Sequence, residues 1–498
     1  MQDTKNTKSK NPTKIVKFLT EIKVLNRNNG MPRKLEWTVL FLIAITLFVS
    51  HSYNDIIITT RHGLNLWYCL FDGKILNFFS YNAGIISGND FFMIPQNAIY
   101  NFFIYVIFAI WNFPLWILEN FAHVDVMNNF FCLIWSKTMI IFFLAISAQV
   151  LKKICIELKM NSNLLNWIVF YYLSSAFVFS SLLIMSQYDI ISVTLMLIGL
   201  LMYLKGNMKG FVLWFMFAIT LKYFALFVFV PLILLKEKRI TKIIMYFFSG
   251  ISLTLLTNFI FSFDKSSSVS TVFLLEMLQK FTNQVLEISI GNTSWFYLLI
   301  ILLFIYCFYK EIKTKEELDK FSVYVSFMSF AVFFGFTNSH PYWIIFILPF
   351  TLLLIFQNAK NLRINMVIET IMSCALILAQ MIVYPFCFSD YTYKAMLLPR
   401  IFVKLSDLPK LLTTDSLAKH PFFNLFVMGN ILPLLIAVFV ACLIALAVIN
   451  FPSTKKEKVI DQEIDANVIM VRLLLGGAVC LLPIAGYFVS VIYKLYFF

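Results

Sequence analysis

The sequence predicts an all-α, polytopic transmembrane helical bundle, and three observations support this fold class. Of the 498 residues, 60% are hydrophobic and 13% are charged, which is more apolar surface than a water-soluble chain can bury. Long apolar runs recur along the chain, and a helix needs about 20 such residues to cross a membrane. Lysine and arginine gather in short clusters between the runs, as is typical of loops that orient membrane helices.

The same composition excludes two other classes of protein. The net charge of +14 does not indicate a nucleic-acid partner, because the basic residues form no continuous surface. The eight cysteines include no C-x-x-C pair, so neither a zinc site nor a disulfide framework is predicted. Membrane lipids are the predicted surroundings.

The chain begins with a polar, lysine-rich segment, residues 1–36, which we interpret as a cytoplasmic tail. The apolar run that follows from Trp37 ends without a small-residue cleavage pattern, so we expect an uncleaved first helix. About 13 apolar runs follow one another through the chain. They begin near Trp37, Ala98, Phe131, Leu164, Ile190, Phe211, Ile240, Trp295, Phe321, Tyr342, Met366, Phe422 and Leu473.

Two topologies fit these runs. If every run spans the membrane, five lysines between residues 152 and 209 lie outside. If instead the run 98–121 stays outside and the run 211–235 is a re-entrant hairpin, these lysines lie inside, which satisfies the positive-inside rule better. We prefer the second topology, although the sequence leaves open whether 98–121 and 211–235 span or re-enter.

The predicted hairpin 211–235 carries a lone cation, Lys222, near its middle. Two half-helices of about 12 residues would each be roughly 18 Å long, so the turn would bring Lys222 to mid-membrane. A turn at that depth requires surrounding protein or a wet cavity. Lys137 is the other main charge that falls inside an apolar run.

The long first outer loop, residues 51–130, is expected to carry interfacial helices. Leu64, Trp67 and Phe71 repeat at helical spacing, and Asp72-Gly73 supplies a stop signal. Residues 269–288 alternate apolar and polar faces at helical spacing, which predicts a further interfacial helix.

Two acidic residues lie at membrane edges on the outer side of the preferred topology. Asp55 follows the first helix, and Asp189 ends the short loop Ser186-Gln187-Tyr188-Asp189. An acid at such an edge can accept a proton from a bound hydroxyl. The alternative is that Asp189 caps the helix that starts at Ile190, because aspartate is preferred at that position.

Three sequence blocks carry a family resemblance. The first runs from Tyr53-Asn54-Asp55-Ile56 through Thr59-Thr60-Arg61-His62-Gly63 to Trp67 and Leu70-Phe71-Asp72-Gly73. The second joins Ser186-Gln187-Tyr188-Asp189 to Leu221-Lys222-Tyr223-Phe224-Ala225-Leu226, and the third is Ser339-His340-Pro341-Tyr342-Trp343. They resemble bacterial GT-C glycosyltransferases, especially the branch that uses polyprenol-phosphate-mannose. Ser186 stands where glycine is usual, and the remaining residues match only in hydropathy.

The resemblance implies a GT-C fold with residues 37–350 as the catalytic transmembrane module. Residues 351–498 would form C-terminal transmembrane helices with an outer loop, 389–420. The family transfers a sugar from a lipid phosphate to an acceptor outside the cytoplasmic membrane, using an acid of the first outer loop as general base. On that pattern the catalytic residues are Asp55, the base, and Asp189, which would orient the acceptor or the donor sugar.

The resemblance also implies the ligands. A polyprenyl-phosphate sugar is the expected donor, and a glycolipid, glycan or cell-wall polymer is the expected acceptor. A phosphate leaving group needs fixed positive charge nearby, and a mid-membrane lysine is usually functional or paired. The substrate-binding residues expected are Arg61, His62, Gln187, Tyr188, Lys222, His340, Tyr342 and Arg400.

No metal and no cofactor are predicted. Neither Asp55 nor Asp189 has an acidic partner two residues later, so too few oxygen ligands for a hard cation are visible. The composition, rich in isoleucine, lysine, asparagine and phenylalanine, indicates a low-GC bacterium and hence a bacterial cell membrane. The expected enzyme is a metal-independent monosaccharide transferase with an extracytoplasmic site.

Two other functions stay open. A transporter or flippase of lipid-linked oligosaccharide would also be basic and polytopic, although it usually shows an internal repeat and buried ionisable residues along a path. A polymerase of surface polysaccharide would share the location and differ in substrate size. Neither an internal repeat nor a low-complexity tract is visible in the sequence.

Overall fold

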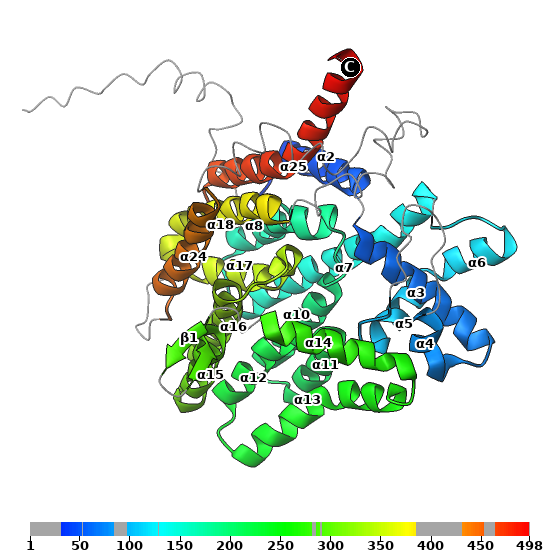
Figure 1. The fold of residues 1–498 in the computed structure, drawn as a ribbon. Coiled ribbons are helices and arrows are strands. Elements are labelled where there is room, and N and C mark those ends of the chain that lie inside the picture. The colour runs from blue at the N-terminus through cyan, green and yellow to red at the C-terminus, as the bar shows by residue number, and fades with distance from the viewer. Residues whose placement is uncertain are drawn as a thin grey trace, which may run out of the picture.

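The computed structural model describes residues 31–51, 53–83, 97–127, 129–280, 285–288, 291–384, 431–452 and 464–497. The described chain is predominantly helical, which confirms the predicted all-α bundle (Figure 1). In this part of the chain, seven helices are long and apolar enough to cross a membrane, or up to nine if two bent pairs each count as one span. The predicted outer loop 389–420 and Arg400 lie outside the described residues.

The first helices form a bent pair. They are α2 (Lys34–Ser50) and α3 (Asn54–Phe71), followed by η1 (Ile75–Asn77) and α4 (Phe78–Ala83). The axes of α2 and α3 differ by 66° because His51 has extended backbone angles. Helix α3 ends at Phe71, and Gly73 adopts a φ of +66°, so the predicted stop at Asp72-Gly73 is confirmed.

The apolar run 98–121 forms two short helices that pack on α3. They are α5 (Phe102–Trp111) and α6 (Phe113–Phe121), which bend by 65° relative to one another. Gly63 of α3 lies directly against the backbone of Phe108, and the indole of Trp67 donates to the carbonyl of Ala109 at 2.9 Å. Helices α3 to α6 therefore gather on one side of the molecule (Figure 1).

The central part of the bundle is formed by the helices that follow in sequence. They are α7 (Phe130–Glu157), α8 (Ser162–Leu173), α9 (Ala176–Val178), the π-helical turn η2 (Phe179–Ile184) and α10 (Ile190–Leu204). Every residue of η2 is buried.

The chain then reverses at Lys222. Helix α11 (Met208–Leu221) is followed by η3 (Tyr223–Ala225) and α12 (Leu226–Lys236), and Lys222 itself is extended, with φ −149°. The ring of Phe229 lies 5.2 Å from that of Phe211 and 5.3 Å from that of Phe215. Because these rings flank the break on both sides, α12 folds back along α11. The predicted interruption at Lys222 is therefore present.

The next segment contains one prediction that is wrong. It comprises α13 (Ile240–Phe261), η4 (Lys265–Ser267), α14 (Ser268–Lys280), β1 (Val285–Ile288) and β2 (Gly291–Ser294). The helix expected over 269–288 ends at Lys280, and β1 pairs with β2 in an antiparallel hairpin. β-branched Val285 and Ile288 suit a strand, and β2 supplies their backbone partners.

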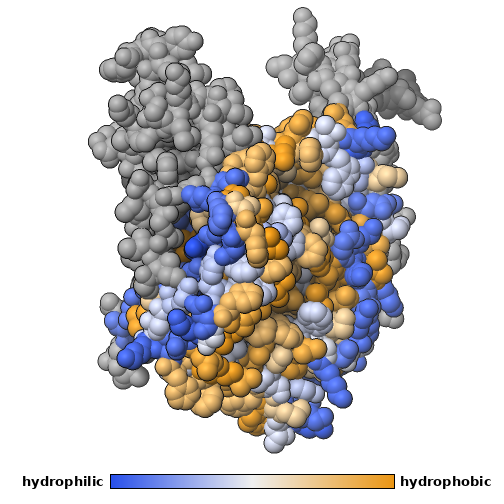
Figure 2. Space-filling view, turned by 90° about the vertical axis from the view of Figure 1, so that its right-hand side faces the viewer, coloured by the Kyte–Doolittle hydropathy of each residue, from blue (hydrophilic) through white to orange (hydrophobic). Residues whose placement is uncertain are grey.

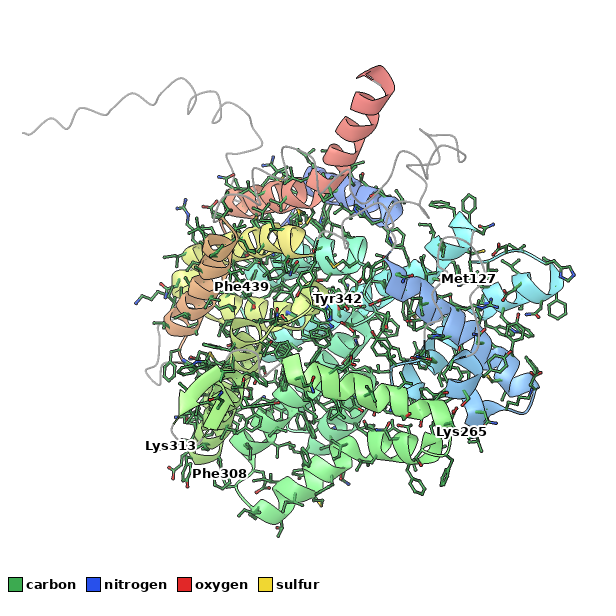
Figure 3. The ribbon with its side chains drawn as sticks, in the orientation of Figure 1. Met127, Lys265, Phe308, Lys313, Tyr342 and Phe439 are labelled. Carbon is green, nitrogen blue, oxygen red and sulfur yellow. The ribbon has the colours of Figure 1, made fainter. Side chains whose placement is uncertain are left out.

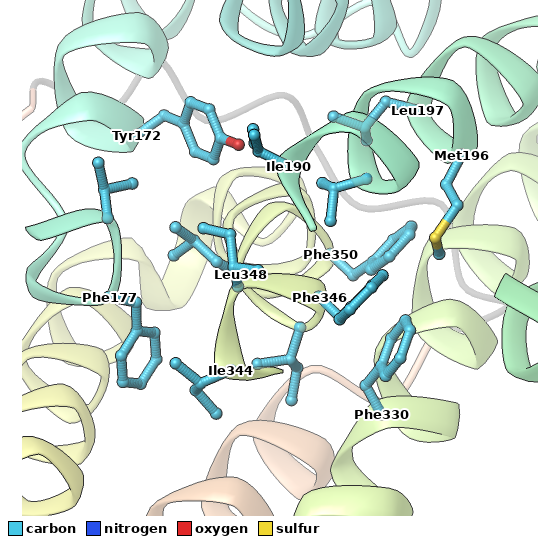
Figure 4. Packing of buried hydrophobic residues seen from close by; sticks show 14 of the residues in the cluster. Tyr172, Phe177, Ile190, Met196, Leu197, Phe330, Ile344, Phe346, Leu348 and Phe350 are labelled. Atoms are coloured by element: carbon cyan, nitrogen blue, oxygen red, sulfur yellow. The ribbon is translucent and has the colours of Figure 1, made fainter. Parts of the chain in front are cut away.

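The remaining helices complete the bundle. They are α15 (Trp295–Tyr309), α16 (Lys315–Phe336), η5 (Pro341–Phe346), α17 (Leu348–Gln357), η6 (Ala359–Asn361), α18 (Leu362–Val383), α24 (Ile431–Ile449) and α25 (Ala466–Phe497). The η5–α17 segment lies inside the core. Figure 4 shows its residues Ile344, Phe346, Leu348 and Phe350 packed among side chains of α10 and α16.

One buried ion pair joins α25 to the bundle. The guanidinium of Arg472 binds both oxygens of Glu369 on α18, at 2.5 and 2.9 Å, and both side chains are almost fully buried. Arg472 also donates to the carbonyl of Tyr171 at 2.9 Å, and the Tyr171 hydroxyl donates to Glu369 at 3.1 Å. The charges are thus paired and fully hydrogen-bonded, as a buried pair requires.

Polar contacts divide the loops into two groups at opposite ends of the bundle. One group, the basic end, comprises the described residues 157–162, 205–209, 236–240, 307–315, 357–363, 449–452 and 464–465. Lys315 pairs there with Glu157 at 2.8 Å, Lys238 donates to the carbonyl of Cys307 at 2.7 Å, and Asn358 donates to Asn450 at 2.9 Å.

The other group, the site end, comprises the described residues 51, 53–83, 97–127, 185–189, 262–267, 337–341 and 384. Asp264 accepts from the backbone N–H of Phe79 at 2.8 Å, Asn101 donates to Thr257 at 2.7 Å, and Tyr384 donates to the carbonyl of Ser339 at 3.3 Å. Figure 3 shows Lys265 of the site end and Lys313 of the basic end on opposite sides of the molecule.

The outer surface of the bundle is apolar. Figure 2 shows a broad hydrophobic area on the face that carries α3 to α6, with hydrophilic residues towards its margins. Large exposed apolar side chains also cover α13, among them Phe248, Leu255 and Phe259. Such a surface agrees with a multi-pass membrane protein, since water would not solvate it.

Candidate functional site

Side chains from three distant segments meet at the site end. The side-chain amide of Gln187 donates to Asp55 Oδ2 at 3.1 Å, and Lys222 Nζ lies 2.9 Å from Asp189 Oδ1. We call these four residues the acidic cluster. Asp55 is in the first turn of α3 just after the bend, Gln187 and Asp189 lie in the loop before α10, and Lys222 occupies the break between α11 and α12.

Asp189 is the buried counter-ion of Lys222. It is 1% exposed, and although it stands at the start of α10 its side chain caps no backbone N–H of that helix. The capping alternative is therefore not supported by the geometry. Apart from the ion pair with Lys222, neither of its oxygens accepts a hydrogen bond from the part of the chain that is described.

Lys222 is held by rings as well as by charge. Its ammonium lies 4.5 Å from the ring centre of Tyr100 and 5.7 Å from that of Tyr188. Because the chain is extended here, the side chain leaves the helical path and reaches Asp189. The lysine charge is thus stabilised by one carboxylate and two aromatic faces, which is how a cation is tolerated in a protein interior.

Asp55 differs from Asp189 in its surroundings. It is partly exposed, and within the described chain it forms no direct ion pair. The hydrogen bond from Gln187 fixes the orientation of its carboxylate. An oriented, reachable carboxylate without a cation of its own can accept a proton from a substrate hydroxyl. The acidic cluster therefore combines the carboxylate of Asp55, which is in no described ion pair, with the ion pair of Lys222 and Asp189.

Unpartnered polar atoms surround the cluster. Ser186 Oγ and Gln187 Oε1 are buried and make no hydrogen bond to any described residue. Buried polar atoms nearly always have a partner, so atoms of this kind point to a bound group or water. They lie in the same loop as Asp189, and Ser186 has a φ of +52°, which turns the chain sharply there.

Tyr100 and Tyr188 form one wall of the cluster. Their rings meet edge to face at 5.7 Å, and Tyr188 also packs against Phe108 at 5.1 Å. Burial, followed by the negative charge of Asp55, raises the pKa of the Tyr100 phenol well above its usual range. Tyr100 therefore keeps its hydroxyl proton at neutral pH. Tyr188 is 1% exposed and is part of the wall.

His340 and Tyr342 form a second aromatic group beside α3. Their rings stack at 5.3 Å with only 7° between their planes, and His340 also meets Trp343 at 4.8 Å. Tyr342 contacts Tyr53, two residues before Asp55, at 5.9 Å between ring centres. The structure therefore places His340 and Tyr342 at the border of the acidic cluster.

Arg61 and His62 lie away from the acidic cluster. Arg61 pairs with Glu119 of α6, which also accepts from the Tyr68 hydroxyl at 3.1 Å. His62 packs edge-on against Tyr105 of α5 at 5.4 Å. In this conformation both residues attach α3 to the neighbouring helices.

Two residues outside the predicted set contribute to the site. Tyr100 supplies the closest aromatic face to Lys222, and no sequence signal distinguishes it among 22 tyrosines. Lys137 of α7 is fully buried and binds backbone carbonyls next to the cluster. The sequence does indicate Lys137, because a lysine inside an apolar run requires a compensating partner.

The described residues include no group of three or more histidine, cysteine, aspartate or glutamate side chains that could hold a metal ion. The side chains of the acidic cluster offer proton acceptance by Asp55 and positive charge on Lys222. Comparisons with protein-family models, curated proteins and solved structures give no significant match to this chain.

Proposed function

We propose that this chain is a membrane glycosyltransferase that moves a single sugar from a polyprenyl-phosphate-linked donor to a cell-envelope acceptor. The observation that supports it most is the meeting of Asp55 with the Gln187–Asp189 loop, which joins two of the three sequence blocks that resemble GT-C enzymes. The third block lies beside them through the contact of Tyr342 with Tyr53.

In the proposed reaction, Asp55 is the general base. Its carboxylate takes the proton of an acceptor hydroxyl while the hydroxyl oxygen forms a bond to the anomeric carbon of the donor sugar. The bond between that carbon and the phosphate oxygen breaks, and the lipid phosphate leaves with the electron pair. Lys222 stabilises the charge that develops on the phosphate, because a positioned cation acts strongly in a site of low dielectric.

We propose further that the fold is a GT-C bundle of about 13 helices in which 211–235 is a re-entrant hairpin. Among the described residues, lysine and arginine are far more frequent at the basic end than at the site end, where Arg61, Lys74 and Lys265 are found. The positive-inside rule then places the basic end in the cytoplasm and the acidic cluster outside a bacterial cell membrane.

The decisive experiment compares Asp55, in the first turn of α3, with Asp72, which follows the end of that helix. The purified chain is reconstituted with radiolabelled polyprenyl-phosphate sugars and membrane acceptor extract, and sugar transfer is measured for wild type, Asp55→Asn and Asp72→Asn. Asp72 is the matched control, because it is exposed and its one ion pair among the described residues is with Lys74, also an exposed side chain. We expect Asp55→Asn to lose at least about 100-fold in rate, the usual contribution of a general base. Transfer that survives in Asp55→Asn at the control rate removes Asp55 as the base.

A transporter or flippase is the second candidate, and one observation favours it. Helices α11 and α12 are interrupted at Lys222, a partly buried ionisable residue, as discontinuous helices are at the binding sites of secondary transporters. The same vesicles distinguish the two functions. Movement of the lipid-linked sugar between leaflets without any transfer, lost in Lys222→Met, would select the transporter.

A further inference from the structure

Lys137 is a buried lysine without a carboxylate partner in the part of the chain that the structure describes. It lies in α7 and is 0% exposed. Its ammonium donates to the carbonyls of Phe48 and His51, and to that of Leu183 at 3.3 Å. It also lies 4.6 Å from the ring centre of Phe48. All its described hydrogen-bond partners are backbone carbonyls.

These carbonyls belong to the segments that lead to Asp55 and to the Gln187–Asp189 loop. Phe48 and His51 are at the C-terminal end of α2, where carbonyls lack partners within the helix and the helix dipole is negative. Asp55 follows four residues after His51. Leu183 is near the end of η2, and Gln187 follows four residues later.

From this geometry we infer that Lys137 is a positioning residue, which holds the end of α2 to the end of η2 and thereby sets the Asp55–Gln187 contact. A salt bridge could not do this, because the groups that must be held are backbone carbonyls on two different segments. A lysine ammonium has three donors and can bind both segments at once. The geometric role of Lys137 does not depend on the proposed function, whereas its expected effect on sugar transfer rests on that function.

The first test measures geometry and needs no substrate. Asp55→Cys and Gln187→Cys are combined, and the pair is joined in membranes by a short bifunctional thiol reagent. The linked peptides are quantified by mass spectrometry, which separates them from products of the native cysteines. The cross-link is measured in four proteins that carry this cysteine pair: one with Lys137 unchanged, one with Lys137→Met, one with Lys137→Arg and one with the control substitution Lys153→Met. Lys153 is an exposed lysine of the same helix.

We expect the yield of the 55–187 link to fall several-fold in Lys137→Met, to be retained better in Lys137→Arg, and to be unchanged in Lys153→Met. An unchanged yield in Lys137→Met overturns the inference. If Lys137→Met fails to accumulate in membranes, Lys137→Gln takes its place with the same two outcomes. If neither neutral variant nor Lys137→Arg accumulates, the lysine serves folding as a whole and the inference is overturned.

The second test applies to transfer by the otherwise unaltered chain. Displacing a base by about 1 Å can cost on the order of 100-fold in rate, so Lys137→Met should lower kcat by about that factor. KM should stay near the wild-type value, because Lys137 does not touch the substrate. A change in KM alone would contradict the inference. If no variant or wild type transfers sugar, the proposed function fails while the cross-linking result still decides the role of Lys137.

Discussion

At the residue scale, the Lys222–Asp189 pair sets the electrostatics of the site. The two groups lie 2.9 Å apart, and their side chains are 12% and 0% exposed. Such a pair offers little net stability against an apolar alternative, whereas removal of one partner leaves an uncompensated buried charge. The pair is therefore better explained by function than by stability.

This difference leads to a double-substitution test. Asp189→Asn and Lys222→Met should each lower the free energy of unfolding by about 3–5 kcal/mol, because each leaves one charge unpaired. The double variant should recover most of that loss and still fail to transfer sugar. Thermal unfolding in detergent and the transfer assay measure the two effects. Additive losses of stability in the double variant would mean that the residues are not coupled.

Sequence could place some of these residues and not others. The motif around Asp189 and the lone lysine in an apolar run pointed to Asp189 and Lys222, and the preferred topology placed Asp55 on the same side as Asp189. The ion-pair partner of Arg61 could not be predicted from the sequence. Glu119 is 58 residues away, and it reaches Arg61 only because α5 and α6 bend by 65° and lie against α3.

At the element scale, the seam between α3 and α5 depends on a glycine. A Cβ atom at Gly63 would lie 2.8 Å from the carbonyl carbon and the Cβ of Phe108. Both helices approach one another closely there, and Trp67 adds its hydrogen bond to Ala109 from the next turn of α3. The position of α3, and with it that of Asp55, is fixed by this close approach.

Substitution of Gly63 therefore has a specific expected effect. Gly63→Val should destabilise the protein by about 1–3 kcal/mol, the usual cost of overpacking, and should lower sugar transfer by moving α3. Gly335→Ala is the matched control, because a Cβ at that helical glycine meets nothing within 4 Å. The control should be neutral or slightly stabilising, since alanine favours helix over glycine by about 1 kcal/mol. Equal midpoints of thermal unfolding for Gly63→Val and the control would contradict the importance of the seam.

The elements also show where periodicity misleads. Over 269–288 the apolar spacing fits a helix, and α14 follows it as far as Lys280. At Val285–Ile288 the pairing with Gly291–Ser294 decides the structure, and strand pairing of this kind leaves little trace in helical spacing. The interruption at Lys222 could be predicted, because a charged side chain in an apolar run costs free energy unless the structure compensates it. Helical spacing alone gives no such constraint.

At the scale of the whole molecule, the contacts at the two ends constrain the topology. The segment from Met208 to Lys236 leaves the basic end and returns to it, because Tyr203 donates to the carbonyl of Leu232 at 2.9 Å. The acidic cluster forms only because of this return, since Lys222 is the point of reversal. Asp55 and Asp189 therefore lie at the same end of the bundle.

Cysteine labelling tests the orientation of these ends. Lys265→Cys at the site end should react with a membrane-impermeant maleimide in intact cells, whereas Asn207→Cys at the basic end should react only after permeabilisation. Both positions are exposed, and the unsubstituted chain reports any reaction of the native cysteines. Labelling of position 207 from outside would reverse the orientation and place the acidic cluster in the cytoplasm.

The buried Arg472–Glu369 pair has a consequence for biosynthesis. Glu369 emerges from the ribosome 103 residues before its partner, so α18 must enter the membrane while that carboxyl group has no guanidinium to bind. A charged residue in a membrane helix costs about 2.5–3.5 kcal/mol during insertion, which the apolar remainder of α18 has to offset. This cost is relieved only when Arg472 of α25 binds Glu369. The assembly of α25 is thus a late step that stabilises α18, because it supplies the guanidinium that binds Glu369.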